Sequence, residues 1–126
     1  MTDLRKKLIR DCDNLFRKII YSRDKCSCQR CKATAKQLNC SHFYSRSIKV
    51  LRWNQLNAVC LCVGCHFWGH QNPLEFSEWY KNHIGLNAFN NLTLSRSNRF
   101  RTSESNLEIM KLVLETDLEK IKINAR

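Results

Sequence analysis

Apolar residues recur at helical spacing near the start of the chain, and the basic residues of the same segment lie mostly on other faces of the helix this predicts. A repeat of three to four residues is typical of an amphipathic helix whose apolar side packs inward. We therefore expect a helix over residues 3–22. Its apolar positions are Leu4, Leu8, Ile9, Cys12, Leu15, Phe16, Ile19 and Ile20.

The middle of the chain predicts two strands and a helix. The segment before this helix is predicted to be a β-hairpin with a long loop: residues 38–44 form its first strand, and a charged loop over residues 45–52 follows. A second strand then leads into a helix that is expected to begin near Val63. Trp53, between the two strands, is expected to be a packing anchor.

The last third of the chain predicts further helices. Asn72, Pro73 and Glu75 form an N-cap, a first-turn proline and a capping-box residue, so a helix should run from here to about Ile84, with Gly85 as its C-cap. Residues 86–102 have weak periodicity and suggest a short helix and a loop.

A long final helix should open with a capping box formed by Ser105 and Glu108. Its apolar stripe consists of Leu107, Met110, Leu114, Leu118 and Ile121. We expect this stripe to pack against the first helix, and the alternative is pairing with a second copy in a homodimer.

These elements predict a small α+β fold in one domain spanning residues 1–126. Residues 1–25 form the N-terminal helix, residues 26–72 a zinc-stabilised core, and residues 73–126 the C-terminal helices. A length of 126 residues fits one domain, which a bound metal would help to stabilise.

The eight cysteines include two similar groups, CSCQRC and CLCVGC. In a reducing compartment, short paired spacings indicate metal binding before they indicate disulfides. Cys28 with Cys31 and Cys62 with Cys65 predict a four-thiolate structural zinc site that joins the two ends of the hairpin. Cys26 and Cys60 remain competing ligands, Cys12 is expected in the core, and a secreted disulfide framework is the alternative for the whole set.

Positive charge is concentrated in the first part of the chain. Residues 1–52 carry 14 Lys and Arg against four acidic residues, whereas residues 53–126 carry eight against seven, and the net charge is +11. This distribution favours nucleic acid as the partner, with a solvated basic face or an anionic membrane surface as alternatives. The expected DNA contacts are Arg46, Lys49, Arg52, Arg96, Arg99 and Arg101.

The histidines carry the candidate chemistry. A helix from Val63 places His66 and His70 on one face, where two imidazoles can share an ion. A histidine on the first strand, followed by a strand and such a helix, resembles the HNH, or ββα-metal, nuclease motif. The resemblance implies that His42 is the general base, that Asn57 holds that imidazole or its strand in place, and that His66 and His70 bind a catalytic Mg²⁺, Mn²⁺ or Zn²⁺.

One position departs from this motif. The family has a metal ligand, commonly Asp or His, directly before the first histidine, and this chain has Ser41 there. A further ligand must then come from Asn39, Cys40 or Ser41, or from water and substrate phosphate. The alternative for the whole pattern is a zinc-stabilised module that binds nucleic acid without cutting it.

The run from the first helix to Asn72 also resembles the Rap or NinG family of lambdoid-phage recombination endonucleases, although members of that family tend to have Asn at the place of His66. The landmarks are the knuckle at Cys28 and Cys31, the triplet Ser41-His42-Phe43, the run from Arg52 to Asn57, and the knuckle at Cys62 and Cys65.

This resemblance implies a structure-specific endonuclease that acts on branched DNA such as Holliday junctions and D-loops. A nicking or duplex-cutting HNH enzyme is the alternative. The sequence shows no apolar run of about 20 residues and no signal-peptide pattern after Met1, so we expect no membrane partner and a cytoplasmic location, that of the host cell if the protein is phage-encoded.

Overall fold

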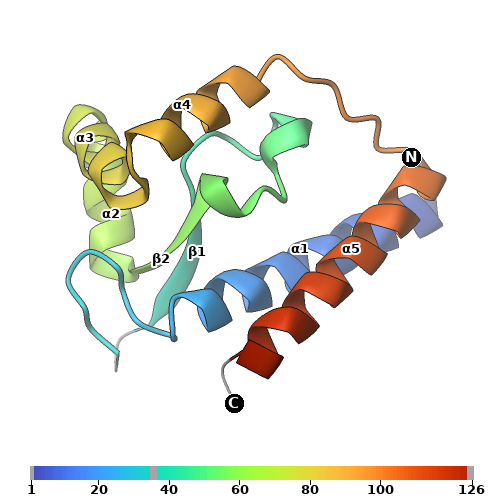
Figure 1. Cartoon of the computed structure of the whole chain (residues 1–126), viewed down its shortest axis with the longest axis horizontal. Helices are drawn as coiled ribbons and strands as arrows, with labels where there is room; N and C mark the ends of the chain where they lie inside the picture. Colours follow the sequence, from blue (N-terminus) through green and yellow to red (C-terminus); the bar gives the residue numbers. More distant parts are fainter. Residues whose placement is uncertain (1, 35–36, 125–126) are drawn as a thin grey trace.

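The first and last helices lie side by side and run in the same direction (Figure 1). A computed structural model describes residues 2–34 and 37–124 of the chain. Helix α1 spans Asp3–Arg23 and α5 spans Glu104–Asn124, and Arg5 near the start of α1 donates hydrogen bonds to Thr102 just before α5. Their shared core contains Leu8, Cys12, Phe16, Ile19, Ile20, Leu107, Leu114 and Leu118. The expected first helix and its packing against the last one are thus confirmed.

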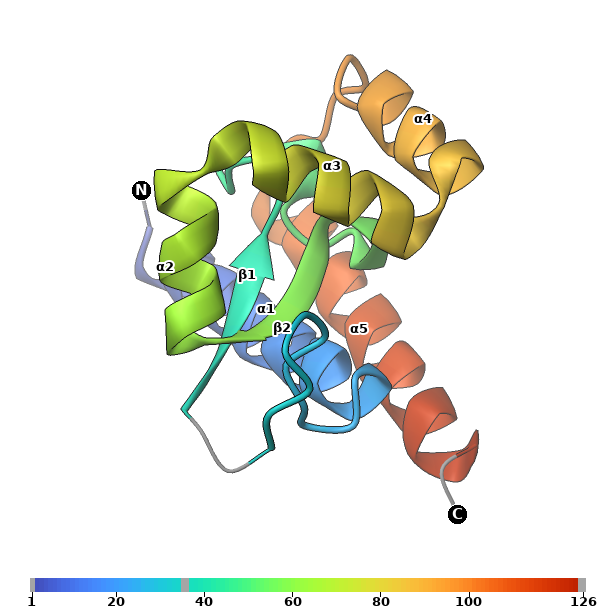
Figure 2. The ribbon, with the colours of Figure 1, turned by 90° about the vertical axis from the view of Figure 1, so that its left-hand side faces the viewer.

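A two-stranded antiparallel sheet separates this core from a second one (Figure 2). Strand β1 spans Leu38–His42 and pairs with β2, Ala58–Cys62, with Cys40 opposite Cys60. Every residue of β2 is buried. Because successive side chains point to opposite faces, Ala58 and Cys60 join the core of α1 and α5, whereas Val59 and Leu61 join the second core.

The outer edge of β2 is closed by the segment that follows α1. Arg23 donates from Nη2 to the Ala58 carbonyl at 2.7 Å, and the Asp24 carboxylate accepts from the Cys60 N–H at 2.9 Å. The Gln29 N–H donates to the Cys60 carbonyl at 3.0 Å. These bonds satisfy edge groups that would otherwise be unpaired in the interior. The outer edge of β1 is left for the cavities of the candidate site.

Three helices cover the other face of the sheet. Helix α2 (Val63–Gln71) begins where the sequence predicts, α3 spans Pro73–Ile84, and α4 spans Leu86–Ser95. Gly85 caps α3 with φ of 93°, a conformation that favours glycine. Together with α1 and α5 these elements give five α-helices and one sheet within the described residues, so the predicted α+β class is confirmed.

One predicted strand boundary differs from the structure. The first strand ends at His42 rather than Tyr44, because Asn57 accepts the next two N–H groups through its carbonyl and its side chain. Residues 86–95 form the short helix expected within residues 86–102, and a loop follows it, as predicted.

Two predicted caps were wrong. The Asn72 side chain does not cap α3, because its amide donates to the Trp68 carbonyl and closes α2 instead. The start of α5 is capped by Ser103, whose Oγ accepts from the Asn106 N–H, so the box predicted from Ser105 begins two residues too late.

Two short 3-10 turns, η1 (Lys49–Leu51) and η2 (Gln55–Asn57), shape the loop between the strands. Asp13 of α1 fixes this loop. Its carboxylate accepts from Arg52 Nε at 2.9 Å and Nη2 at 2.6 Å, and from Trp53 Nε1 at 2.9 Å. Burial opposes ionisation of Asp13, but these donors outweigh it and hold the pKa of the carboxyl below its usual range. Trp53 is buried and anchors the loop in the first core, as expected.

We expect Asp13→Asn to lower the free energy of unfolding by about 1–3 kcal/mol at pH 7, because two charge-assisted hydrogen bonds are lost. Urea unfolding measures the change, and Glu108→Gln on an exposed part of α5 is the control. Since the folded pKa is lowered, the contribution of Asp13 is fully present above its unfolded pKa and is lost as the pH falls through the folded pKa. A deficit that does not shrink as the pH is lowered below about 4 would contradict an ionic role.

Candidate functional site

Two C-x-x-C turns bring four cysteines together. Cys28 and Cys31 lie in the turn after α1, Cys62 ends β2 and caps α2, and Cys65 lies in the first turn of α2. Their sulfur atoms all lie within 4.8 Å of one another. A tetrahedral zinc ion with Zn–S bonds of about 2.3 Å needs sulfurs roughly 3.8 Å apart. The four cysteines are thus placed to hold a metal ion, which is consistent with structural zinc.

The backbone of each turn supports thiolates. The Cys31 N–H donates to Cys28 Sγ and the Cys65 N–H donates to Cys62 Sγ, both at 3.4 Å. Burial by itself would raise the pKa of Cys28, but neighbouring backbone N–H groups outweigh it and lower that pKa to about 6. Lys32 closes the first turn with φ of 68°, its N–H donating to the Cys28 carbonyl at 2.8 Å.

Arg30 supplies a positive charge beside the four sulfurs. Its Nη1 donates to Cys65 Sγ at 3.5 Å, and its guanidinium lies 3.5 Å from the centre of the Trp68 ring. Four thiolates around one Zn²⁺ carry a net charge of −2, so a cation at this distance offsets part of the excess.

The remaining cysteines lie outside this group. In residues 2–34 and 37–124, the only set of three or more His, Cys, Asp or Glu side chains spaced to hold an ion is the four-cysteine set. Cys26 is exposed, and Cys60 is buried with its pKa raised to about 12 by desolvation. Cys12 is buried between α1 and α5, as expected. The structure therefore favours the predicted ligand set over one that includes Cys26 or Cys60.

We expect the purified chain to hold about one zinc ion and Cys28→Ser to lose it, with a large fall in melting temperature, because structural zinc contributes directly to folding. Elemental analysis and thermal unfolding with and without a chelator measure both. Cys26→Ser, two residues away and exposed, should keep the metal and the melting temperature. Zinc loss in Cys26→Ser with retention in Cys28→Ser would contradict the assignment.

The two histidines of α2 face each other at the end of that helix. His66 Nε2 and His70 Nε2 lie 3.1 Å apart, and the rings meet edge to face. Two nitrogens that bind the same ion, each about 2.0–2.1 Å from it, lie about as far apart as these two Nε2 atoms. The Ser41 hydroxyl lies 2.6 Å from His66 Nδ1, so Nδ1 is occupied by Ser41 and Nε2 is the nitrogen that faces His70. Burial and the neighbouring His70 lower the pKa of His66, which favours the neutral, ligating form.

His42 ends β1, and its ring lies beside Phe16 of α1 with centroids 5.5 Å apart. His42 Nε2 lies 2.9 Å from the Arg52 carbonyl. A carbonyl only accepts, so Nε2 carries the hydrogen and Nδ1 keeps its lone pair. Burial lowers the pKa of His42, and the charge of Arg46 lowers it further, whereas the Arg52 carbonyl partly opposes the shift.

Asn57 fixes the loop that supplies this carbonyl. It is fully buried, its Oδ1 accepts from the Tyr44 N–H at 2.8 Å, and its Nδ2 donates to the carbonyls of Tyr44 at 3.0 Å and Leu51 at 3.1 Å. Arg52 directly follows Leu51, so Asn57 determines where the acceptor of His42 lies. Asn57 thus acts on the loop rather than directly on the imidazole.

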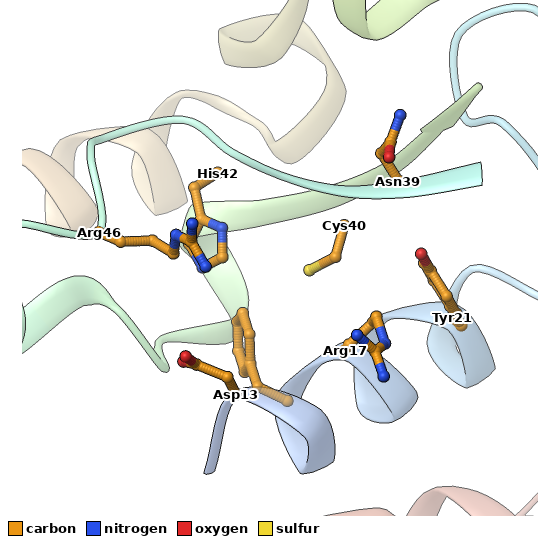
Figure 3. Close-up of a pocket in the computed structure, with 8 residues that line it drawn as sticks. Asp13, Arg17, Tyr21, Asn39, Cys40, His42 and Arg46 are labelled. Atoms are coloured by element: carbon orange, nitrogen blue, oxygen red, sulfur yellow. The ribbon is translucent and has the colours of Figure 1, made fainter. Parts of the chain in front are cut away.

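In the part of the chain that the structure describes, three cavities are lined by His42, and the two that also contain Asn39, Cys40 and Arg46 lie along the open edge of β1. The larger, about 530 Å³, contains His42, His66, His70, Asn39 and Arg46 on its walls. The smaller, about 280 Å³, lies against α1 and is also lined by His42, Asn39 and Arg46 (Figure 3). The structure therefore brings the three predicted histidines to one cavity, with Asn39 on its wall and Ser41 against His66.

The predicted DNA contacts have different surroundings. Arg46 is exposed beside His42, and Lys49 and Arg101 line a separate open pocket with Arg5. Arg99 is exposed, and Arg96 lies with its guanidinium 5.0 Å from the centre of the Tyr44 ring. Arg52 is instead held by Asp13, which gives it a positioning role in the loop.

The sequence placed Arg17 among the basic residues outside the apolar face of the first helix but did not connect it with the candidate site, and Tyr21 was missed. Both side chains line the smaller cavity. Their signal was present in the chain: they stand four residues apart and next to the buried Phe16 and Ile20, at the border of the apolar face. Only the placement of β1 against α1 shows which border residues face the site.

Comparisons with protein-family models, curated proteins and solved structures found no match to this chain. Across the part of the chain that the structure describes, no helix is both long and apolar enough to cross a bilayer.

Proposed function

We propose that this chain is a metal-dependent endonuclease of the HNH, or ββα-metal, type that hydrolyses DNA phosphodiester bonds. The observation that carries the proposal is the cavity in which His42, with Nδ1 unprotonated, shares the walls with the paired Nε2 atoms of His66 and His70. A base and a two-imidazole metal site on one cavity are the groups that phosphodiester hydrolysis requires.

His42 is the proposed general base. Its Nδ1 takes a proton from the attacking water as the new bond to phosphorus forms and the bond from phosphorus to the 3′ oxygen breaks. The bond from Nε2 to the Arg52 carbonyl stabilises the protonated ring that results. The departing oxygen is protonated by solvent.

His66 and His70 are the proposed ligands of the catalytic Mg²⁺, Mn²⁺ or Zn²⁺. A divalent ion held there would stabilise charge on the phosphate and on the departing 3′ oxygen. Ser41 orients His66 through Nδ1, and Asn39 on the cavity wall is the candidate for a further protein ligand, with water and substrate phosphate completing the site.

Branched DNA is the proposed preferred substrate, on the strength of the resemblance to the phage recombination endonucleases. Arg46 would contact DNA beside His42, and Lys49, Arg96, Arg99 and Arg101 would contact it farther along. Symmetric cutting of a four-way junction calls for two active sites, so a homodimer is proposed with it.

We expect the wild-type chain to cut a labelled four-way junction with Mg²⁺ or Mn²⁺ but not with EDTA, and to cut a linear duplex of the same sequence far more slowly. His42→Ala should abolish cutting, while zinc content and DNA affinity stay nearly intact. His83→Ala on α3, where the ring stacks on Trp79, is the matched control and should remain active.

Each of the other possible results would support a different function. Equal cutting of both DNAs would indicate a general duplex or nicking enzyme. Binding without cutting at any metal would indicate the non-catalytic zinc module, which the serine at position 41 favours because it is not a usual ligand for a divalent ion. An active His42→Ala would remove this residue from the mechanism.

We expect the pH profile of kcat/KM to fall on the acid side with a midpoint below about 6.5, because the base must be neutral and burial lowers the pKa of His42. Arg46→Gln removes a nearby positive charge, so the midpoint should move to higher pH even if the plateau is reduced. A midpoint above 6.5, or one unaffected by Arg46→Gln, would contradict His42 as the titrating base.

A further inference from the structure

The smaller cavity is bounded by α1 on one side and the outer edge of β1 on the other (Figure 3). Arg17 and Tyr21 come from α1, Asn39, Cys40 and His42 come from β1, and Arg46 comes from the loop that follows. This cavity lies on the side of His42 that faces α1, whereas His66 and His70 line the larger cavity and not this one.

The charges at the smaller cavity favour an anion. Arg17 and Arg46 are both exposed and reach it from different elements. The one carboxylate on its wall, Asp13, already accepts from Arg52 and Trp53, so its charge is paired with a cation outside the cavity lining. The two arginines therefore leave a net positive charge.

The backbone of β1 presents one donor and one acceptor at this edge. Cys60 turns its N–H and carbonyl away from β1, toward Asp24 and Gln29, so the pair formed by Cys40 and Cys60 is not hydrogen-bonded across the ladder. The N–H and the carbonyl of Cys40 must then both point away from β2. They point to the edge at which the Tyr21 hydroxyl of α1 donates to the Leu38 carbonyl at 3.1 Å. The preference for an anion at this cavity therefore comes from the two arginines.

The two cavities have Asn39, Cys40, His42 and Arg46 in common. A DNA strand that presents one phosphate to His42 in the larger cavity continues on both sides with further phosphates, one per nucleotide. We propose that the smaller cavity binds a backbone phosphate of the cut strand next to the scissile one, between Arg17 of α1 and Arg46. This inference rests on the proposed function and makes α1 a part of the DNA interface.

The test compares Arg17→Ala with Lys18→Ala, because both remove one positive charge from adjacent exposed positions of α1 and only Arg17 lines the cavity. Binding of labelled DNA is measured over a range of KCl concentrations in the inactive His42→Ala background. Arg17→Ala should weaken binding about tenfold and reduce the salt slope by about 1. Lys18→Ala should leave both nearly unchanged, and zinc content and melting temperature should not differ.

A second measurement locates the contact. Single phosphates near the cut are replaced, one at a time, by neutral methylphosphonates, and the wild-type protein and Arg17→Ala are compared in their cleavage of each substituted DNA. When the methylphosphonate replaces one particular phosphate next to the cut, wild type and Arg17→Ala should cleave the DNA equally well. The phosphate charge that Arg17 would contact is already absent from that DNA, so the loss of Arg17 has no further effect.

The outcomes separate this inference from the proposed function. If wild type cuts in a His42-dependent way but Arg17→Ala matches Lys18→Ala, or its deficit persists at every methylphosphonate position, the phosphate site is overturned and the nuclease assignment stands. If wild type neither binds nor cuts DNA, both are overturned.

Discussion

The arrangement of this molecule depends on how a two-stranded sheet satisfies its edges. Backbone groups at a sheet edge need partners, and two strands have two such edges. Arg23, Asp24 and Gln29 close the edge of β2, and the four cysteines hold the same segment against the start of α2. β2 can therefore be buried on both faces, and the open edge of β1 is where side chains from both faces line the cavities of the candidate site.

In the candidate site, neutral polar groups determine how the rings of His42 and His66 are oriented and which nitrogen of His42 carries the hydrogen. The Asn57 side chain accepts from the Tyr44 N–H, in the place where a bond of the sheet ladder would continue β1. It also donates to the Leu51 carbonyl and thereby holds the loop in which the Arg52 carbonyl faces His42. The Ser41 hydroxyl orients the ring of His66. The carbonyl partner leaves Nδ1 of His42 with its lone pair, and the Ser41 contact turns Nε2 of His66 toward His70, so no carboxylate is needed to orient either ring.

Much of this could be predicted from local patterns. The helical repeat identified α1 and the apolar stripe of α5, and the spacing of Cys28, Cys31, Cys62 and Cys65 identified the metal set, because both depend on residues close in sequence or on a fixed ligand chemistry. Caps were less predictable, since Ser103 and Ser105 are chemically alike and only the path of the chain decides which one caps α5.

Contacts between distant segments were the least predictable. The charge of Arg52 suggested DNA, but Asp13, 39 positions earlier, accepts its guanidinium, and no local signal pairs the two. Arg17 was expected on a solvent-facing side, and it faces the site only because β1 packs against α1 at this point. The exposed apolar residues of α5, including Ile109 and Leu112, remain compatible with pairing to a second copy.

Helix α2 carries ligands of both proposed ions within nine residues, Cys65 in its first turn and His66 and His70 after it. A helix this short is not stable by itself in water, so a zinc ion held at its first turn would also supply the order on which the histidine pair depends. Thermodynamic linkage makes such a dependence reciprocal. Binding of either ion should then raise the affinity of the chain for the other ion. Without zinc, the proposed site at His66 and His70 would bind its ion less tightly even though both histidines are unchanged.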